Sequence, residues 1–383
     1  MVCNRAGIKT GNFRISLEIQ NSDDKKDSMT ILSAEPIITT VIPTYRRPSL
    51  LRRAILSVLN QTYPHVCVCV YDNASGDETE KVVRQLMQKD ERIRYHCHPE
   101  NIGLFNNFNY GLQEVETPFF SLLSDDDVLV PTFYEETIKA FRQYPETMLV
   151  CMPTMVVDSL LNVISGPMQV MNTTFYAPGE AVKGMIEVNI PATWTGIVFR
   201  KDVRDQIGLI NPNAGPRADG GFVYHAAARF PLVAVPGLGA VLMAHDNSTS
   251  RTVPPIGIGY MYWWNTIMRT IYEDSKVPLS VKAYILSREL HPNYKNIGIL
   301  QVVRALARGD YDYAKRAAHG VRECGYPLTG KMIKLFIWSC RIIPLLQRVV
   351  VALRESWRRS HIRKNKMLHQ KYGHLAAFIK EYE

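Results

Sequence analysis

Hydrophobic and polar positions follow two alternating patterns between residues 36 and 132. Short apolar runs typical of buried strands occur at 36–43, 65–71, 93–98 and 118–123. Between them, apolar residues recur at helical spacing and predict helices at 49–60, 77–88 and 106–115, the first with Ser49 as its N-cap. Strands that alternate with helices predict βαβ crossovers, and therefore an α/β fold with a doubly wound, mostly parallel sheet.

The pattern weakens after Pro131 but still suggests a division into regions. It predicts helices at 133–144 and 221–229, and strands at 148–157, 194–200, 232–235 and 240–244. From about Gly259 to Gly330 the chain reads as helical and aromatic. We expect a polar, disordered leader at 1–35, an α/β domain at 36–255 with halves 36–132 and 133–255, a helical extension at 256–330 and a basic tail at 331–383.

Polar clusters follow the ends of three predicted strands: Thr44 to Arg47, Asp72 to Ser75, and Ser124 to Asp127. Ligands of doubly wound sheets bind at the carboxyl ends of the strands, so we expect these clusters to meet there. The crowded carboxylates of the third cluster would be relieved by Mg²⁺ or Mn²⁺, and such ions commonly bridge to substrate phosphates. The alternative is a solvated acidic turn or a helix N-cap.

Other features of the sequence narrow the kind of site. No glycine-rich phosphate loop follows the first strand, which argues against NAD-binding and ATP-loop proteins and leaves phosphate to a metal or to basic side chains. Asp72 could accept a hydrogen bond from a nucleotide base, or it could form an Asx-turn that caps the next helix. The cluster His96-Cys97-His98 has no second ligand pair at zinc spacing, and we interpret it as a strand end.

Six motifs resemble, in order and spacing, those of the family-2 inverting glycosyltransferases. They are Ile42 to Pro48, Leu59 to Pro64, Tyr71 to Thr79, Asn101 to Gly103, Asn109 to Leu112 and Ser124 to Pro131. The ordered resemblance covers roughly residues 36–132 and continues more loosely to about 250. It implies a GT-A fold, a nucleotide-diphosphate sugar as donor and Mn²⁺ or Mg²⁺ as cofactor. Among such donors, a UDP-linked sugar is favoured.

The resemblance also implies roles for individual residues. Contacts with the nucleotide sugar are implied for Pro43, Thr44, Tyr45, Arg47, Asp72, Asn73, Asn101, Gly103, Asp125 and Asp126. Metal binding is implied for Asp125, Asp127 and His245, with Asp126 close behind because family members place the acidic pair differently. Asp219 matches the catalytic base, although the family's usual Glu before it is Ala218 here.

Together these features predict an inverting transferase that moves one sugar to an acceptor hydroxyl, with a lipid-linked glycan of cell-surface polysaccharide synthesis as a candidate acceptor. The base would deprotonate the hydroxyl for backside attack on the anomeric carbon. Gln301 to Ala305 lacks the Trp of the processive members' Gln-x-x-Arg-Trp motif, which favours single additions.

One alternative function is that of a nucleotidyltransferase, which should carry a glycine-rich and basic first loop. The other is an inactive relative that binds glycan or membrane, and Ala218 keeps it open.

The charge balance separates the tail from the rest of the chain. The formal charge is +9, from 45 Lys and Arg against 36 Asp and Glu. Residues 331–383 hold 12 of these basic and 3 of these acidic residues, a balance of +9, so the rest of the chain sums to zero. A basic protein of this kind often binds nucleic acid, but the neutral body here does not support that function.

The tail itself predicts a membrane surface as partner. Residues 332–353 are largely apolar, with Lys334, Arg341 and Arg348 seven residues apart and Pro344 as an expected kink. On a helix this gives a narrow cationic stripe, which fits an interfacial anchor on anionic lipid. The alternative is a helix packed on the catalytic domain and followed by a solvated basic tail. No signal peptide or conventional spanning helix is recognised, so we expect a cytoplasmic protein, peripheral on the inner face of the membrane.

The seven scattered cysteines are expected to be free thiols.

Overall fold

The computed structural model describes residues 35–187, 190–212, 218–245, 269–287, 292–323 and 326–382. Residues 37–383 form one compact unit. The predicted leader, apart from Glu35, and the aromatic stretch after Gly259 up to residue 268 lie outside the described residues.

The main sheet has eight strands in the order β3-β2-β1-β4-β10-β6-β11-β9. Their bounds are β1 Ile38–Thr44, β2 Val66–Asp72, β3 Ile93–Cys97, β4 Phe119–Leu122, β6 Leu149–Cys151, β9 Thr174–Tyr176, β10 Ile197–Arg200 and β11 Leu232–Ala234. The predicted α/β fold is confirmed, and the sheet is mixed: β3, β2, β1 and β4 are parallel, whereas β10 runs antiparallel to both β4 and β6.

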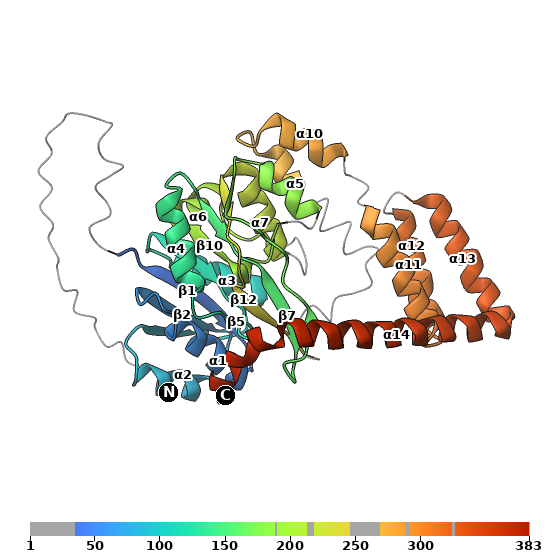
Figure 1. Ribbon diagram of the computed structural model, residues 1–383, viewed down its shortest axis with the longest axis horizontal. Helices are drawn as coiled ribbons and strands as arrows, with labels where there is room; N and C mark the ends of the chain where they lie inside the picture. The colour runs from blue at the N-terminus through green and yellow to red at the C-terminus, as the bar shows by residue number, and fades with distance from the viewer. Residues whose placement is uncertain are drawn as a thin grey trace, which may run out of the picture. The chain divides into compact units, whose positions relative to one another are not determined.

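Helices cover both faces of this sheet (Figure 1). The helices of this part are α1 Pro48–Leu59, α2 Thr79–Met87, α3 Leu104–Gln113, α4 Phe133–Gln143, α5 Glu180–Ile186, α6 Lys201–Ile207 and α7 Ala218–Arg229. Because side chains alternate along a strand, β1 sends Ile38 and Ile42 into the core shared with α1, α2 and α4, and Val41 into the core shared with α3, α5 and α7. Strands buried on both faces explain why their sequences read as continuous apolar runs.

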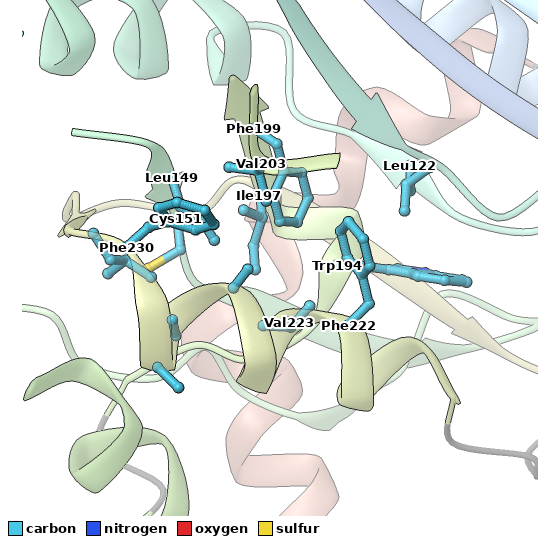
Figure 2. Packing of buried hydrophobic residues seen from close by; sticks show 14 of the residues in the cluster. Leu122, Leu149, Cys151, Trp194, Ile197, Phe199, Val203, Phe222, Val223 and Phe230 are labelled. Carbon is cyan, nitrogen blue, oxygen red and sulfur yellow. The ribbon is translucent and has the colours of Figure 1, made fainter. Parts of the chain in front are cut away.

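Figure 2 shows how α7 is held on the sheet. Phe222 and Val223 of the helix point toward Ile197 and Phe199 of β10, and Phe230, directly after the helix, lies beside Cys151 of β6. These side chains are all buried. This packing fixes the first turn of α7, which contains Asp219.

A second sheet of four strands has the order β5-β12-β7-β8. Its strands are β5 Val128–Leu129, β7 Thr154–Asp158, β8 Val163–Ser165 and β12 Ala240–Ala244. β5 begins directly after the aspartate triplet, and β12 ends directly before His245, so this sheet brings those two regions together. It packs against the C-terminal 3-10 segment η3 Gly373–Tyr382, whose Ala376, Ile379 and Tyr382 are buried there.

Some predicted boundaries were wrong for physical reasons. Helix α1 begins at Pro48 with Arg47 in the N-cap position, not at Ser49, because the missing N–H of proline costs nothing at the first helical position. The strand predicted at 148–157 is two strands, β6 and β7, which belong to different sheets and are separated at Pro153. The strand predicted at 194–200 begins with a 3-10 turn, η1 Trp194–Gly196.

The C-terminal region is helical, as predicted. Its helices are α10 Leu279–Ser287, α11 Pro292–Leu306, α12 Tyr311–Glu323, α13 Pro327–Ile342 and α14 Pro344–Tyr372. The expected kink at Pro344 is a break: α13 and α14 form a pair bent by 111°. Arg348 is therefore on a different helix from Lys334 and Arg341, and the predicted single stripe is divided. Among the described residues, no single helix is both long and apolar enough to cross a bilayer.

Candidate functional site

The three predicted polar clusters meet at one edge of the main sheet. In the pairing of β1 with β2, Thr44 lies opposite Asp72. The Thr44 hydroxyl donates to Oδ2 of Asp125 at 2.8 Å, which joins the first cluster to the aspartate triplet. The prediction that these loops converge is confirmed.

Arg47 is the cation nearest to two of the aspartates. Its Nη1 lies 3.0 Å from Oδ1 of Asp125 and 3.1 Å from Oδ2 of Asp126. Burial raises the pKa of Asp125 to about 6, against the opposing effect of Arg47. The carboxylate of Asp125 is thus held between one cation and one hydroxyl, with almost no exposure to water.

Asp127 faces the protein interior. Its Oδ2 accepts from the Thr195 hydroxyl at 3.0 Å, and its Oδ1 accepts from the backbone N–H of Met243 at 3.1 Å. Burial raises the pKa of Asp127 well above its usual range, and the neighbouring Asp126 raises it further. These contacts attach the triplet to η1 and β12, and they occupy both oxygens of a residue that the resemblance made a metal ligand.

Asp126 and His245 form the second polar pair of the triplet. Nε2 of His245 lies 3.0 Å from Oδ2 of Asp126. A carboxylate and an imidazole at this distance are a donor set suited to a divalent cation that also takes phosphate oxygens and water. Among the described residues, no group of three or more His, Cys, Asp or Glu side chains is arranged to hold a metal ion. The donor set therefore fits a cation shared with a bound diphosphate rather than a closed protein site.

The loops after β2 and β3 are joined by amide side chains. Asn73 donates from Nδ2 to Oδ1 of Asn101 at 2.9 Å and accepts at Oδ1 from the N–H of Ile102 at 2.7 Å. The N–H of Gly103 donates to the same Asn101 oxygen at 2.9 Å. Gly103 has a φ of 87°, a conformation that favours glycine, immediately before α3.

Asp72 is almost fully buried beneath these loops. Its Oδ1 accepts from the N–H of Ser75 at 2.9 Å, and its Oδ2 accepts from the Tyr95 hydroxyl at 2.7 Å. The first contact is the local backbone interaction that the alternative interpretation of this residue expects. Burial and the Asp72 carboxylate both raise the pKa of Tyr95.

Two adjoining cavities contain most of the predicted site. A cavity of about 220 Å³ is lined by the loops after β1, β2 and β3; its residues are Pro43, Thr44, Tyr45, Arg47, Asn73, Asn101, Leu104, Asn107 and Asp125. A cavity of about 340 Å³ is lined by Asp125, Asp126, Asp127 and Asp219 together with apolar side chains of α3, η1 and β12. Pro43, Arg47, Leu104 and Asp125 line both cavities.

Asp219 lies in the first turn of α7 and lines the larger cavity together with the aspartate triplet. A negative charge in the first turn of a helix is stabilised by the helix dipole. The position gives Asp219 access to the same space as the triplet.

Several residues of the site were not predicted. Trp194 and Thr195 of η1 line the larger cavity, as do Phe105 and Phe108 of α3. A side chain at Gly196 would place Cβ 2.6 Å from the carbonyl oxygen of Met152, directly after β6, so the backbones approach too closely there for another residue. The sequence around Thr195 gave only a strand signal, and its contact with Asp127 spans 68 residues.

The interpretation of the His96 cluster as a strand end is confirmed. β3 ends at Cys97, His96 stacks on Tyr110 with ring centroids 4.7 Å apart, and Nε2 of His98 pairs with Oδ1 of Asn107 at 2.9 Å. The described cysteines are free thiols, as predicted: Cys67, Cys69, Cys97, Cys151 and Cys340.

Comparison with known proteins finds similarity over the part of the chain that carries most of this site. The family model described as Glycosyl transferase family 2 matches residues 39–186. A relative from Campylobacter jejuni, named GalNAc(5)-diNAcBac-PP-undecaprenol beta-1,3-glucosyltransferase, is 35% identical over 96 residues, which are 25% of this chain and 31% of the relative. An uncharacterized glycosyltransferase of Rickettsia felis is 35% identical over 110 residues, 28% of this chain and 18% of the relative. The chain thus spans less than a third of the length of these two relatives.

A solved structure shares the fold over a longer stretch. Residues 1–349 of S. aureus TarS, in complex with UDP-GlcNAc, match 79% of this chain and 91% of that one, with a TM-score of 0.58 and 14% sequence identity. At this identity the match establishes the GT-A-like fold and leaves the chemistry to the residues of the site.

Proposed function

Residues 39–186 match the model of glycosyl transferase family 2 and the chain has a GT-A-like fold, and from that premise we propose that it transfers one sugar from a nucleotide-diphosphate sugar to an acceptor hydroxyl with inversion at the anomeric carbon. The observation that carries the proposal is the pair of adjoining cavities. They share Arg47 and Asp125, and one of them is lined by both Asp219 and the aspartate triplet.

The smaller cavity suits the nucleotide. Its lining offers amide and hydroxyl groups from Thr44, Asn73 and Asn101, with Tyr45 partly exposed at the edge. Arg47, between the cavities, would bind diphosphate oxygens, since its guanidinium already lies against two carboxylates. A UDP-sugar is the first donor to test, because TarS, of the same fold, was solved with UDP-GlcNAc.

The larger cavity suits the sugar and the acceptor. Asp219 would accept the proton of the acceptor hydroxyl as that hydroxyl attacks the anomeric carbon, on the side opposite the departing diphosphate. Trp194 and Phe108, with ring centroids 4.3 Å apart, give this cavity an apolar wall for a sugar ring. Exclusion of water by this wall would protect the donor from hydrolysis.

We propose Mg²⁺ or Mn²⁺ as the cofactor. Asp126 and His245 would hold the ion, with Asp125 and Asp127 beside them as charged and structural support. When bound, the ion would neutralise charge that develops on the diphosphate leaving group. Removal of divalent cations with EDTA is expected to lower turnover at least tenfold, with recovery after Mn²⁺ is added back.

The substitution Asp219→Asn tests the proposed reaction. It is expected to lower the rate of UDP release by about 100-fold or more, the usual contribution of a general base, while the affinity for UDP stays the same. Asp312→Asn, at an exposed position on α12, is the control and should behave like wild type. Full turnover by Asp219→Asn would remove this residue from the mechanism. Absence of metal-dependent turnover over a broad donor panel would favour the inactive relative.

We also propose a lipid-linked acceptor and a place on the inner face of the membrane. The name of the Campylobacter relative describes an undecaprenol-linked acceptor, and α13 exposes a set of apolar side chains, Leu328, Met332, Leu335, Phe336, Trp338 and Ile342. The full chain should sediment with phosphatidylglycerol vesicles and not with phosphatidylcholine vesicles. Equal binding to both, or to neither, would contradict the proposal.

A further inference from the structure

A basic cleft lies between α12 and α13, two helices that form no part of the site described above. Its volume is about 520 Å³, and its lining residues are Tyr311, Lys315, Arg316, His319, Lys334, Ile337, Trp338 and Arg341. Four of these are Lys or Arg, two from each helix. Among the described side chains that line the cleft, none is acidic.

The positive charge of the cleft is poorly balanced by the protein. Lys315 pairs with Asp312 at 3.6 Å, and both side chains are more than half exposed, so this pair contributes little. Within the described part of the chain, Arg316, Lys334 and Arg341 form no ion pair with an acidic residue. Like charges gathered in one cleft repel each other, and a bound anion would relieve that repulsion.

The helix α13 presents three sectors in turn around its axis. Ile333, Ile337 and Cys340 are buried against α11 and α12. Because an α-helix completes a turn in about 3.6 residues, Lys334 and Arg341 lie on nearly the same side of it, at the border of that buried sector. Beyond them comes an arc of exposed apolar side chains, which includes Leu335 and Trp338 at 64% and 61% exposure. This order is unusual for a helix in water, where the outer sector is polar.

We propose that the cleft binds the phosphate of an anionic phospholipid headgroup while the exposed apolar arc of α13 enters the acyl region of the same leaflet. The shared border between the basic cleft and the apolar arc is what favours a lipid. A soluble phosphate compound would be held by the cations alone and would leave the arc in water. Side chains such as Lys334 can lay their methylene stems along apolar surface and direct their charge toward phosphate. Trp338, at the edge of both, suits the interface between headgroups and acyl chains.

This inference rests on the proposed membrane location and is independent of sugar transfer. The test uses the full chain and vesicles made of one part phosphatidylglycerol to two parts phosphatidylcholine. The cleft variant carries Lys315→Gln, Arg316→Gln, Lys334→Gln and Arg341→Gln. The control variant loses the same four charges from the exposed part of α14, through Arg359→Gln, Arg363→Gln, Lys364→Gln and Lys366→Gln.

The cleft variant is expected to bind these vesicles at least tenfold more weakly than wild type. The control variant should also bind more weakly, but the fall in the logarithm of its affinity should be less than a third of the fall in the cleft variant. An equal loss in both variants would mean diffuse attraction by the whole tail and would overturn the cleft as a site. If wild type itself does not bind, the membrane location fails. If wild type and the cleft variant bind alike, only the cleft fails.

Two further measurements separate a lipid from other anions and from misfolding. Acyl-brominated lipids should quench tryptophan fluorescence in wild type, and most of that quenching should vanish in Trp338→Phe. Glycerophosphoglycerol, a soluble form of the headgroup, should compete only weakly; competition as strong as that of vesicles would assign the cleft to a free phosphate ester. UDP affinity, which belongs to the cavities of the catalytic domain, should be unchanged in the cleft variant.

Discussion

Thr195 shows how one hydroxyl can support a buried carboxylate. It is itself buried, and its hydroxyl donates to Asp127, which also receives the N–H of Met243. A buried carboxylate that loses one of its two hydrogen-bond donors still carries the full free-energy cost of desolvation. It then has one hydrogen bond fewer to offset that cost.

We predict that Thr195→Val lowers the free energy of unfolding by about 1–3 kcal/mol, measured by urea denaturation at pH 7. It should also weaken UDP binding in the presence of Mn²⁺, because the triplet loses part of its support. Thr195→Ser keeps the donor and is expected to restore most of the UDP affinity. Equal UDP affinity in the Val and Ser variants would show that this hydrogen bond does not position the triplet.

Several of the site residues that the sequence predicted lie at the end of a strand in the parallel half of the sheet or shortly after it. Thr44, Asn73 and Asp125 belong to this group, because a strand ending in polar residues is visible locally. The contacts of Thr195 and Met243 depend on β10 and β12, which join the structure from 68 and 116 residues away. The local pattern of apolar and polar residues does not indicate which distant residues will contact each other.

At the scale of elements, the helices and strands between positions 36 and 123 were predictable, because the helices have a clear apolar period and the strands are short apolar runs. The smaller elements were not: β5 has two residues and β8 and β9 have three each, too few to show alternation. The amphipathic C-terminal segment posed a different problem. An apolar helix face fits a lipid surface and a protein surface equally well, and sequence alone does not say which one covers it.

In the last ten described residues, protein covers the apolar face. In η3, Ala376, Ile379 and Tyr382 pack with Val128, Val163 and Val241 of the second sheet. Nη1 of Arg52 on α1 donates to the carbonyl of Tyr382 at 2.7 Å. This end of the predicted tail is part of the core of the second sheet, whose β5 directly follows the aspartate triplet.

We therefore predict that Ile379→Asp lowers the free energy of unfolding by more than about 3 kcal/mol, since it buries an unpaired carboxylate. Ile379→Val, which removes one methyl group, should cost only about 0.5–1.5 kcal/mol. Thermal denaturation of both variants is the measurement. A mild effect of the Asp variant, similar to that of Val, would mean that η3 leaves the sheet at little cost.

This packing decides how membrane association can be studied. A chain that ends near Gly330 would lose η3 along with the basic residues, and the second sheet would be exposed. Loss of vesicle binding by such a truncated chain would then have two explanations. Charge substitutions on α12, α13 and α14 leave the packed end in place, which is why the variants above are substitutions.

For the whole molecule, the charge excess falls on a segment with three distinct parts. The helix α13 combines basic and apolar side chains, the exposed middle of α14 carries basic residues such as Arg359 and Lys364, and η3 packs on the second sheet. The helix α14 contacts α11 and α13 at its beginning and β8 near its end. Its 29 residues span about 43 Å at 1.5 Å per residue. A segment that would meet lipid is thus joined by a continuous helix to the second sheet, whose β5 directly follows the aspartate triplet.

This arrangement predicts that the membrane matters for lipid-linked acceptors only. Binding to a surface confines enzyme and lipid-linked acceptor to the same layer and raises their effective concentration, whereas a water-soluble acceptor gains nothing from it. We expect anionic vesicles to raise kcat/KM at least tenfold for a polyprenyl-linked glycan and to leave it unchanged for the same glycan without its lipid. The cleft variant should lose the vesicle effect and keep its rate on the soluble glycan, because its substitutions lie outside the cavities that hold Asp219 and the aspartate triplet. An equal rise for both acceptors would instead mean that lipid changes the catalytic domain itself, through α14 and the second sheet.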